Sequence, residues 1–127
     1  MRVRIYYHHT DCGGVVYYAE YLKFLEEART EFLEERGIQI KKLAEEGTLF
    51  VVSRQEIDYK SPAFYGDILE IEARLNKIMG VRLEFEYDIK NQKDKVVSRA
   101  RTVMACIDKN FKPRAIPEEI RKQLTTP

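Results

Sequence analysis

Long segments of alternating apolar and polar residues in the second half of the chain constrain the fold more than any other feature. In residues 68–79 the apolar side chains fall at every second position from Leu69 to Leu75, and in residues 81–90 they do so from Val81 to Ile89. Alternation with a period of two is typical of a strand with one face covered and one face in water. Strands of about ten residues exceed the usual five or six, so we expect a long, curved sheet.

Residues 96–107 form a third strand of similar length but carry apolar side chains on both faces. This pattern predicts either an internal strand or one at a contact between subunits. A further strand is expected at residues 50–60, before a break at Pro62 and Gly66.

A single long helix precedes these strands. In residues 18–37 the apolar residues Leu22, Leu25, Ala28 and Phe32 recur at helical spacing, and Gly37 is suited to end the helix. A shorter helical piece is expected near residues 38–47, and Pro117 should open a terminal helix.

The N-terminal residues 2–9 also alternate, which predicts a strand with Tyr7 and His9 facing inward and His8 facing outward. The order is then one strand, one long helix and four strands with mostly short antiparallel connections. This is an α+β arrangement, in which a long curved antiparallel sheet wraps around one central helix.

Size and composition indicate one domain, residues 1–127, because 127 residues with 44% apolar content support one modest core. With 22 basic and 21 acidic residues the net charge is +1, so no large field of one sign is available to attract nucleic acid or anionic lipid. We expect no nucleic-acid partner and no integral membrane segment. Two distant cysteines and the lack of a signal-peptide pattern favour a reduced protein in the cytoplasm.

The stretch HHTDCGG, residues 8–14, carries the chemistry that the periodic segments lack. Asp11 lies shortly before the long helix, where free backbone N–H groups and the helix dipole stabilise negative charge. The glycines leave backbone amides accessible, so that these can bind an oxyanion or a polarised carbonyl. An anionic group beside an oxyanion pocket supplies the parts needed for acyl transfer.

Other interpretations of the same stretch stay open. Asp11 is also a suitable helix cap, and Cys12 near a helix start is a candidate nucleophile. His9, Asp11 and Cys12 are a candidate metal site, although neighbouring His8 and His9 on a strand would point to opposite faces. We expect no metal and no cofactor.

Two motifs resemble a known family. YYHHTDCGGVVYYAEYLKFLEEARTEFL is similar to the N-terminal signature of hotdog-fold acyl-CoA thioesterases, the YbgC-like and 4-hydroxybenzoyl-CoA thioesterase family. EIDYKSPAFYGDILEI resembles the second motif of the same family, in which a Tyr and Pro-Ala are followed by Gly-Asp and a long strand. The resemblance implies a hotdog fold and hydrolysis of an acyl-CoA thioester to free acid and CoA.

Carried over to this sequence, the resemblance implies that Asp11 is the catalytic carboxylate, which either attacks the thioester carbonyl or activates a water. Tyr7 matches a tyrosine that accompanies it. Many YbgC-like members have a histidine at the place of Tyr18; in the hydroxybenzoyl-CoA branch a tyrosine stands there, and its backbone N–H polarises the carbonyl. A thiol near pKa 8.5 leaves without a strong general acid, so no Ser-His-Asp triad is needed.

The resemblance also implies an acyl-CoA substrate and a homodimer or homotetramer. Gly14 and Val15 belong to the motif expected to line the substrate site, and Lys60 and Arg99 are candidates for binding CoA phosphates by their charge and outward placement. The alternative function is a non-catalytic hotdog module that binds acyl-CoA or an acyl carrier protein. The acyl group, aliphatic or aromatic, is not predicted.

Overall fold

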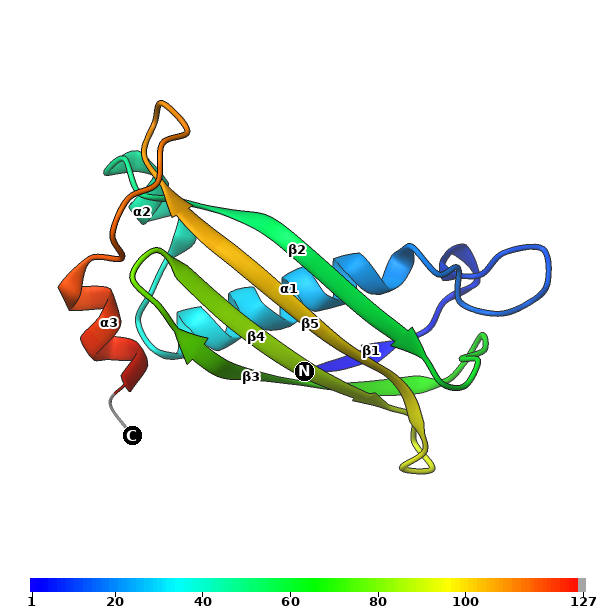
Figure 1. Ribbon diagram of the computed structural model, residues 1–127. Coiled ribbons are helices and arrows are strands. Elements are labelled where there is room, and N and C mark those ends of the chain that lie inside the picture. The colour runs from blue at the N-terminus through cyan, green and yellow to red at the C-terminus, as the bar shows by residue number, and fades with distance from the viewer. Residues whose placement is uncertain (126–127) are drawn as a thin grey trace.

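The computed structural model describes residues 1–125 and shows one antiparallel sheet curving around one long helix (Figure 1). The five strands lie in the order β1-β3-β4-β5-β2. Along the chain, the elements are β1 (Arg2–Arg4), a 3-10 turn η1 (Tyr7–His9), α1 (Glu20–Glu35), α2 (Ile40–Glu45), β2 (Leu49–Tyr59), β3 (Ile68–Ile78), β4 (Arg82–Lys90), β5 (Val96–Ile107) and α3 (Glu118–Thr125). The predicted hotdog architecture is confirmed.

Helix α1 crosses the inner face of the sheet (Figure 1). Apolar side chains of the helix pack against this face. Phe24, Leu25 and Ala28 are buried on the helix, and the partly buried Phe32 meets Phe85 of β4 edge to face at 5.5 Å. Gly37 follows the helix with a φ of +78°, a conformation that residues with a Cβ adopt only under strain. The predicted end of the helix at Gly37 is therefore correct.

The sheet order differs from a simple meander. Strand β2 pairs with β5, while β3 lies between β1 and β4, so the chain crosses from one side of the sheet to the other between β2 and β3. Strand β5 has neighbours on both sides, as its two apolar faces predicted. A register shift between Val52 and Arg54 breaks the regular alternation expected for residues 50–60.

The predicted strand over residues 2–9 is wrong beyond Arg4. Strand β1 has only three residues, and Tyr7–His9 form the 3-10 turn η1, closed by a hydrogen bond from the Thr10 amide to the Tyr7 carbonyl at 3.0 Å. Tyr7 is 77% exposed rather than inward. The turn forms because the Tyr6 amide donates to His9 Nδ1 at 2.9 Å and the Tyr6 carbonyl accepts from the His9 amide at 3.0 Å, so the chain bonds to itself here instead of to a neighbouring strand.

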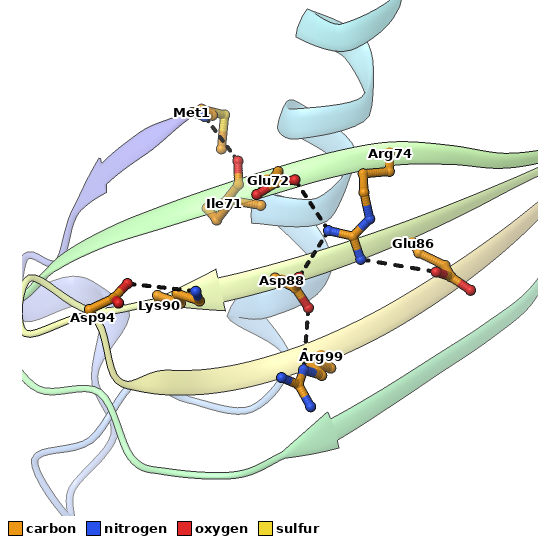
Figure 2. A network of polar contacts seen from close by, with 9 residues as sticks. All are labelled: Met1, Ile71, Glu72, Arg74, Glu86, Asp88, Lys90, Asp94 and Arg99. Carbon is orange, nitrogen blue, oxygen red and sulfur yellow. Dashed lines mark hydrogen bonds and ion pairs between the residues drawn. The ribbon is translucent and has the colours of Figure 1, made fainter.

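The outer face of the sheet carries ion pairs instead of a second layer. Figure 2 shows Asp88 of β4 between Arg74 of β3, at 2.9 Å, and Arg99 of β5, at 3.3 Å. Arg74 also lies within ion-pair distance of Glu72 and Glu86. The two faces of the sheet therefore differ completely in chemistry.

No helix among residues 1–125 is long and apolar enough to cross a membrane.

Candidate active site

The segment between η1 and α1 is a tight loop held by its own backbone. Asp11 and Val15 are joined by a hydrogen bond from the Asp11 amide to the Val15 carbonyl at 2.9 Å, and Gly14, with a φ of +80°, donates its amide to the Asp11 carbonyl at 3.1 Å. Bridges from Thr10 to Val16 and from Val15 to Phe64 tie the loop to itself and to the segment after β2. This geometry requires a glycine at position 14.

A hydrogen bond within the loop holds one of the two oxygens of the Asp11 carboxylate. Oδ1 accepts a hydrogen bond from the Gly13 amide at 2.8 Å. Oδ2 has no hydrogen-bond partner among residues 1–125, and the side chain is exposed at the wall of a cavity. Asp11 thus presents one oriented, unpartnered carboxylate oxygen.

Helix α1 begins without a side-chain cap. Its N-cap residue is Ala19, after a turn closed by a hydrogen bond from the Glu20 amide to the Tyr17 carbonyl at 2.9 Å. The interpretation of Asp11 as a helix cap is therefore wrong, because its carboxylate bonds within its own loop. Within residues 1–125, the amides of Tyr18 and Ala19 donate to no acceptor, so two N–H groups remain free at the helix start.

An open cavity of about 350 Å³ lies against this turn. Its wall is mostly apolar and aromatic: Tyr21 and Tyr59 pack edge to face at 5.5 Å, and Tyr18 and Tyr59 at 6.4 Å. Burial, with smaller contributions from Tyr59 and Asp67, raises the pKa of Tyr21 to about 12, so this phenol stays neutral near pH 7. The complete lining is Asp11, Val15, Val16, Tyr18, Tyr21, Tyr59, Lys60, Ser61 and Pro62.

The structure brings four of the predicted site residues to this one cavity: Asp11, Val15, Tyr18 and Lys60. Gly14 lies in the same loop but shapes the backbone rather than the wall.

Two further predicted residues lie elsewhere in the described chain. Tyr7 sits on the exposed turn η1, with its ring against Tyr65 at 6.1 Å. Arg99 lies on the outer face of the sheet, paired with Asp88 (Figure 2). Arg74 and Arg101 pair with acidic residues on that same face.

Sequence reasoning assigned no site role to Tyr21 and Tyr59, although both line the cavity. Tyr59 ends a predicted strand, and Tyr21 lies in the predicted long helix. The signal for Tyr59 was its place in the second family motif, one residue before Lys60.

A metal site from His9, Asp11 and Cys12 does not assemble. Within the described part of the chain, no three His, Cys, Asp or Glu side chains group closely enough to hold a metal ion. Cys12 is an exposed free thiol, whereas Cys106 is buried and its pKa is raised by burial. Asp11 therefore lies at the cavity wall as a single carboxylate and not, among the described residues, as part of a metal-ligand cluster.

A curved sheet around one helix, with a carboxylate and the residue before the helix start, Tyr18, at an apolar cavity, defines a hotdog-fold enzyme of the thioesterase type. A sequence model of the thioesterase-like superfamily matches residues 5–124, and the chain belongs to this family.

Individual relatives agree. The chain is 39% identical to the acyl-CoA thioester hydrolase YbgC of Escherichia coli O6:H1 over 93% of this chain and 89% of that protein. It is 40% identical to the acyl-CoA thioesterase YbgC of Haemophilus influenzae, covering 94% and 88%. The crystal structure of a hypothetical protein from Aquifex aeolicus superposes with a TM-score of 0.92 at 30% identity, covering 98% of both chains.

Proposed function

We propose that this protein hydrolyses acyl-CoA thioesters to a free acid and CoA, with Asp11 as the catalytic carboxylate and the helix-start amides as the oxyanion site. The observation that carries the proposal is the convergence of Asp11 and the Tyr18 turn on one apolar cavity. The activity named for the YbgC relatives supports the same reaction.

In this mechanism the acyl group occupies the aromatic cavity and its carbonyl oxygen meets the free amides of Tyr18 and Ala19. Donors aimed at a developing oxyanion stabilise the transition state by about 3 to 4 kcal/mol each. The free Oδ2 of Asp11 either attacks the carbonyl carbon or removes a proton from an attacking water. The CoA thiolate leaves, and Lys60 at the cavity wall meets the anionic part of CoA. After direct attack the acyl group is bound to Asp11 as an anhydride, and water hydrolyses this anhydride to release the free acid and regenerate the carboxylate.

The substitution Asp11→Asn tests the proposal. Its Oδ1 still accepts the Gly13 hydrogen bond, so the loop should keep its shape while the anionic oxygen is lost. We expect thiol release from a panel of short, long and aromatic acyl-CoAs to fall by about 100-fold or more, since a positioned base contributes roughly 10²- to 10⁴-fold.

Asp94→Asn is the matched control, because this exposed aspartate lies in the β4–β5 turn with a φ of +62°, which Asn tolerates. A folded Asp11→Asn variant with wild-type turnover would contradict the role of Asp11. Saturable binding of acyl-CoA without thiol release by the wild type would instead identify a non-catalytic acyl-CoA-binding module.

We further expect the chain to form a homodimer or homotetramer and to act in the cytoplasm. Strand β2 is a long sheet edge whose other side has no partner strand among residues 1–125, and Val51 and Val52 are exposed on it. Unpaired apolar edges of this kind are normally covered by another chain. Nothing in the proposed chemistry requires a cofactor.

A further inference from the structure

We propose that the hydroxyl of Tyr59 is a positioning group for the reaction, which holds the Tyr18–Ala19 turn so that its free amides face the thioester oxygen. The observation is a hydrogen bond of 3.0 Å from the Tyr59 hydroxyl to the Tyr18 carbonyl. This inference rests on the proposed thioesterase function and adds to it a residue that does not touch the reacting atoms.

Tyr59 is fixed to a rigid part of the sheet. It is the last residue of β2 and pairs with Ser98 of β5, which is fully buried. The Ser98 hydroxyl donates to the Asp58 carbonyl at 2.9 Å, and the Lys60 amide donates to the Val97 carbonyl at 2.9 Å. The backbone on both sides of Tyr59 is thus bonded to β5, and a site group held on a strand is placed more accurately than one on a loop.

Among residues 1–125, the turn that Tyr59 holds has no other hydrogen bond to the sheet. Upstream, the amides of Val16 and Tyr17 donate to the carbonyls of Ala63 and His9, at 2.8 and 2.9 Å. Downstream, regular helical bonding begins in α1. Between these anchors, within residues 1–125, the Tyr59 hydroxyl makes the only hydrogen bond from the sheet to Tyr18 or Ala19.

The bond acts on the amides through the peptide plane. First, it fixes the direction of the peptide group between Tyr18 and Ala19, and the N–H of this group is the Ala19 amide. Second, a hydrogen bond to the carbonyl of a peptide group polarises the group, so the Ala19 N–H becomes a stronger donor. The Tyr18 amide lies on the other side of the same Cα, and the Tyr18 ring meets Tyr59 edge to face. Burial and the neighbouring Tyr18 raise the pKa of Tyr59, so its hydroxyl keeps its proton near neutral pH.

The test is Tyr59→Phe, which removes one oxygen atom and keeps the ring that lines the cavity. We expect kcat for acyl-CoA hydrolysis to fall on the order of 10- to 100-fold, as small misplacements of catalytic groups do. KM should stay within about twofold of wild type, and so should the Kd of a thioether analogue that lacks the thioester carbonyl. The substitution keeps the cavity wall, so interactions that are equally strong in the ground state and the transition state do not change. The pH profile of kcat should keep its shape, since Tyr59 transfers no proton.

Tyr65→Phe is the matched control, because Tyr65 is exposed and its hydroxyl has no hydrogen-bond partner among residues 1–125. Wild-type kcat in Tyr59→Phe would overturn this inference alone, as would a raised KM at unchanged kcat. Loss of one limb of the pH profile would show that Tyr59 itself donates a proton and would also overturn it. Absence of thiol release by the wild type from every acyl-CoA would overturn the proposed function and this inference together.

Discussion

His9 is the residue that joins the turn before the site to helix α1. Its Nδ1 accepts a hydrogen bond from the Tyr6 amide at 2.9 Å, and its ring packs edge to face on Phe24 of α1 at 5.4 Å. Its carbonyl also accepts the Tyr17 amide directly before the Tyr18–Ala19 turn. The neutral imidazole is therefore part of the fold around Asp11.

The pH dependence of stability should report this role. Burial, and then the charge of His8, lowers the pKa of His9 below its usual 6.5, with Glu20 acting in the opposite direction. Because the unfolded chain binds this proton more readily, the stabilisation is complete above about pH 6.5 and is lost as pH falls through the folded-state pKa. We expect the free energy of unfolding, measured in urea from pH 7.5 to 5, to decrease with falling pH.

His9→Asn should flatten this dependence, because an amide oxygen can replace Nδ1 as acceptor but does not titrate. His8→Asn, at an exposed position, should leave most of it in place. An unchanged slope in His9→Asn would assign the pH dependence to other groups.

At the scale of single residues, the sequence predicted which side chains gather at the cavity better than it predicted how they are arranged. Asp11 and Tyr18 follow from residue types near a helix start together with the family motifs. The exposed position of Tyr7 did not follow, because alternation was extended through a turn. Arg99 faces outward as expected, but charge and outward placement could not show that it pairs with Asp88 away from the cavity. The family motif contains Tyr59, but its hydrogen bond to Tyr18 could not be predicted, since the two residues lie 41 positions apart in the sequence.

Helix α1 is stable because the sheet covers one side of it. Leu25 is fully buried, whereas Leu22, three residues earlier on the same helix, is 46% exposed. We expect Leu25→Ala to lower the free energy of unfolding by about 2 to 5 kcal/mol, since it removes buried methyl groups and leaves a cavity. Leu22→Ala should cost about 1 kcal/mol or less. Equal losses in urea denaturation would contradict the assigned faces of the helix.

The existence of most elements was predictable, but their connections were not. Alternation locates β3, β4 and β5 to within a residue or two. This works because one face of each strand packs in the core with α1, and that burial selects apolar residues at every second position. The register shift in β2 and the crossing between β2 and β3 depend on pairing with β5. Local patterns carry no information about such long-range pairing.

For the molecule as a whole, the curved sheet separates two kinds of chemistry. The inner face packs on α1, and beyond one end of that helix lie Asp11 and the aromatic cavity. The outer face carries interleaved arginines and carboxylates across β3, β4, β5 and β2, including Glu84, which is buried between Asn76 and Arg101. Changes on the outer face should therefore affect stability without affecting turnover.

Asp88→Asn tests this separation, because the Asp88 carboxylate bridges Arg74 and Arg99 with its two oxygens (Figure 2). Its side chain is 27% exposed, so the pairs are screened by solvent and the loss of stability should be about 1 kcal/mol or less at low salt. In 1 M NaCl, where the Debye length is about 3 Å, the difference from wild type should shrink. Urea denaturation at both salt concentrations measures this difference in stability, with Asp94→Asn as the control for a more exposed aspartate.

We expect kcat and KM of Asp88→Asn to be unchanged, because the ion pairs lie on the opposite face of the sheet from the cavity. A large fall in kcat at full stability would refute the independence of the two faces.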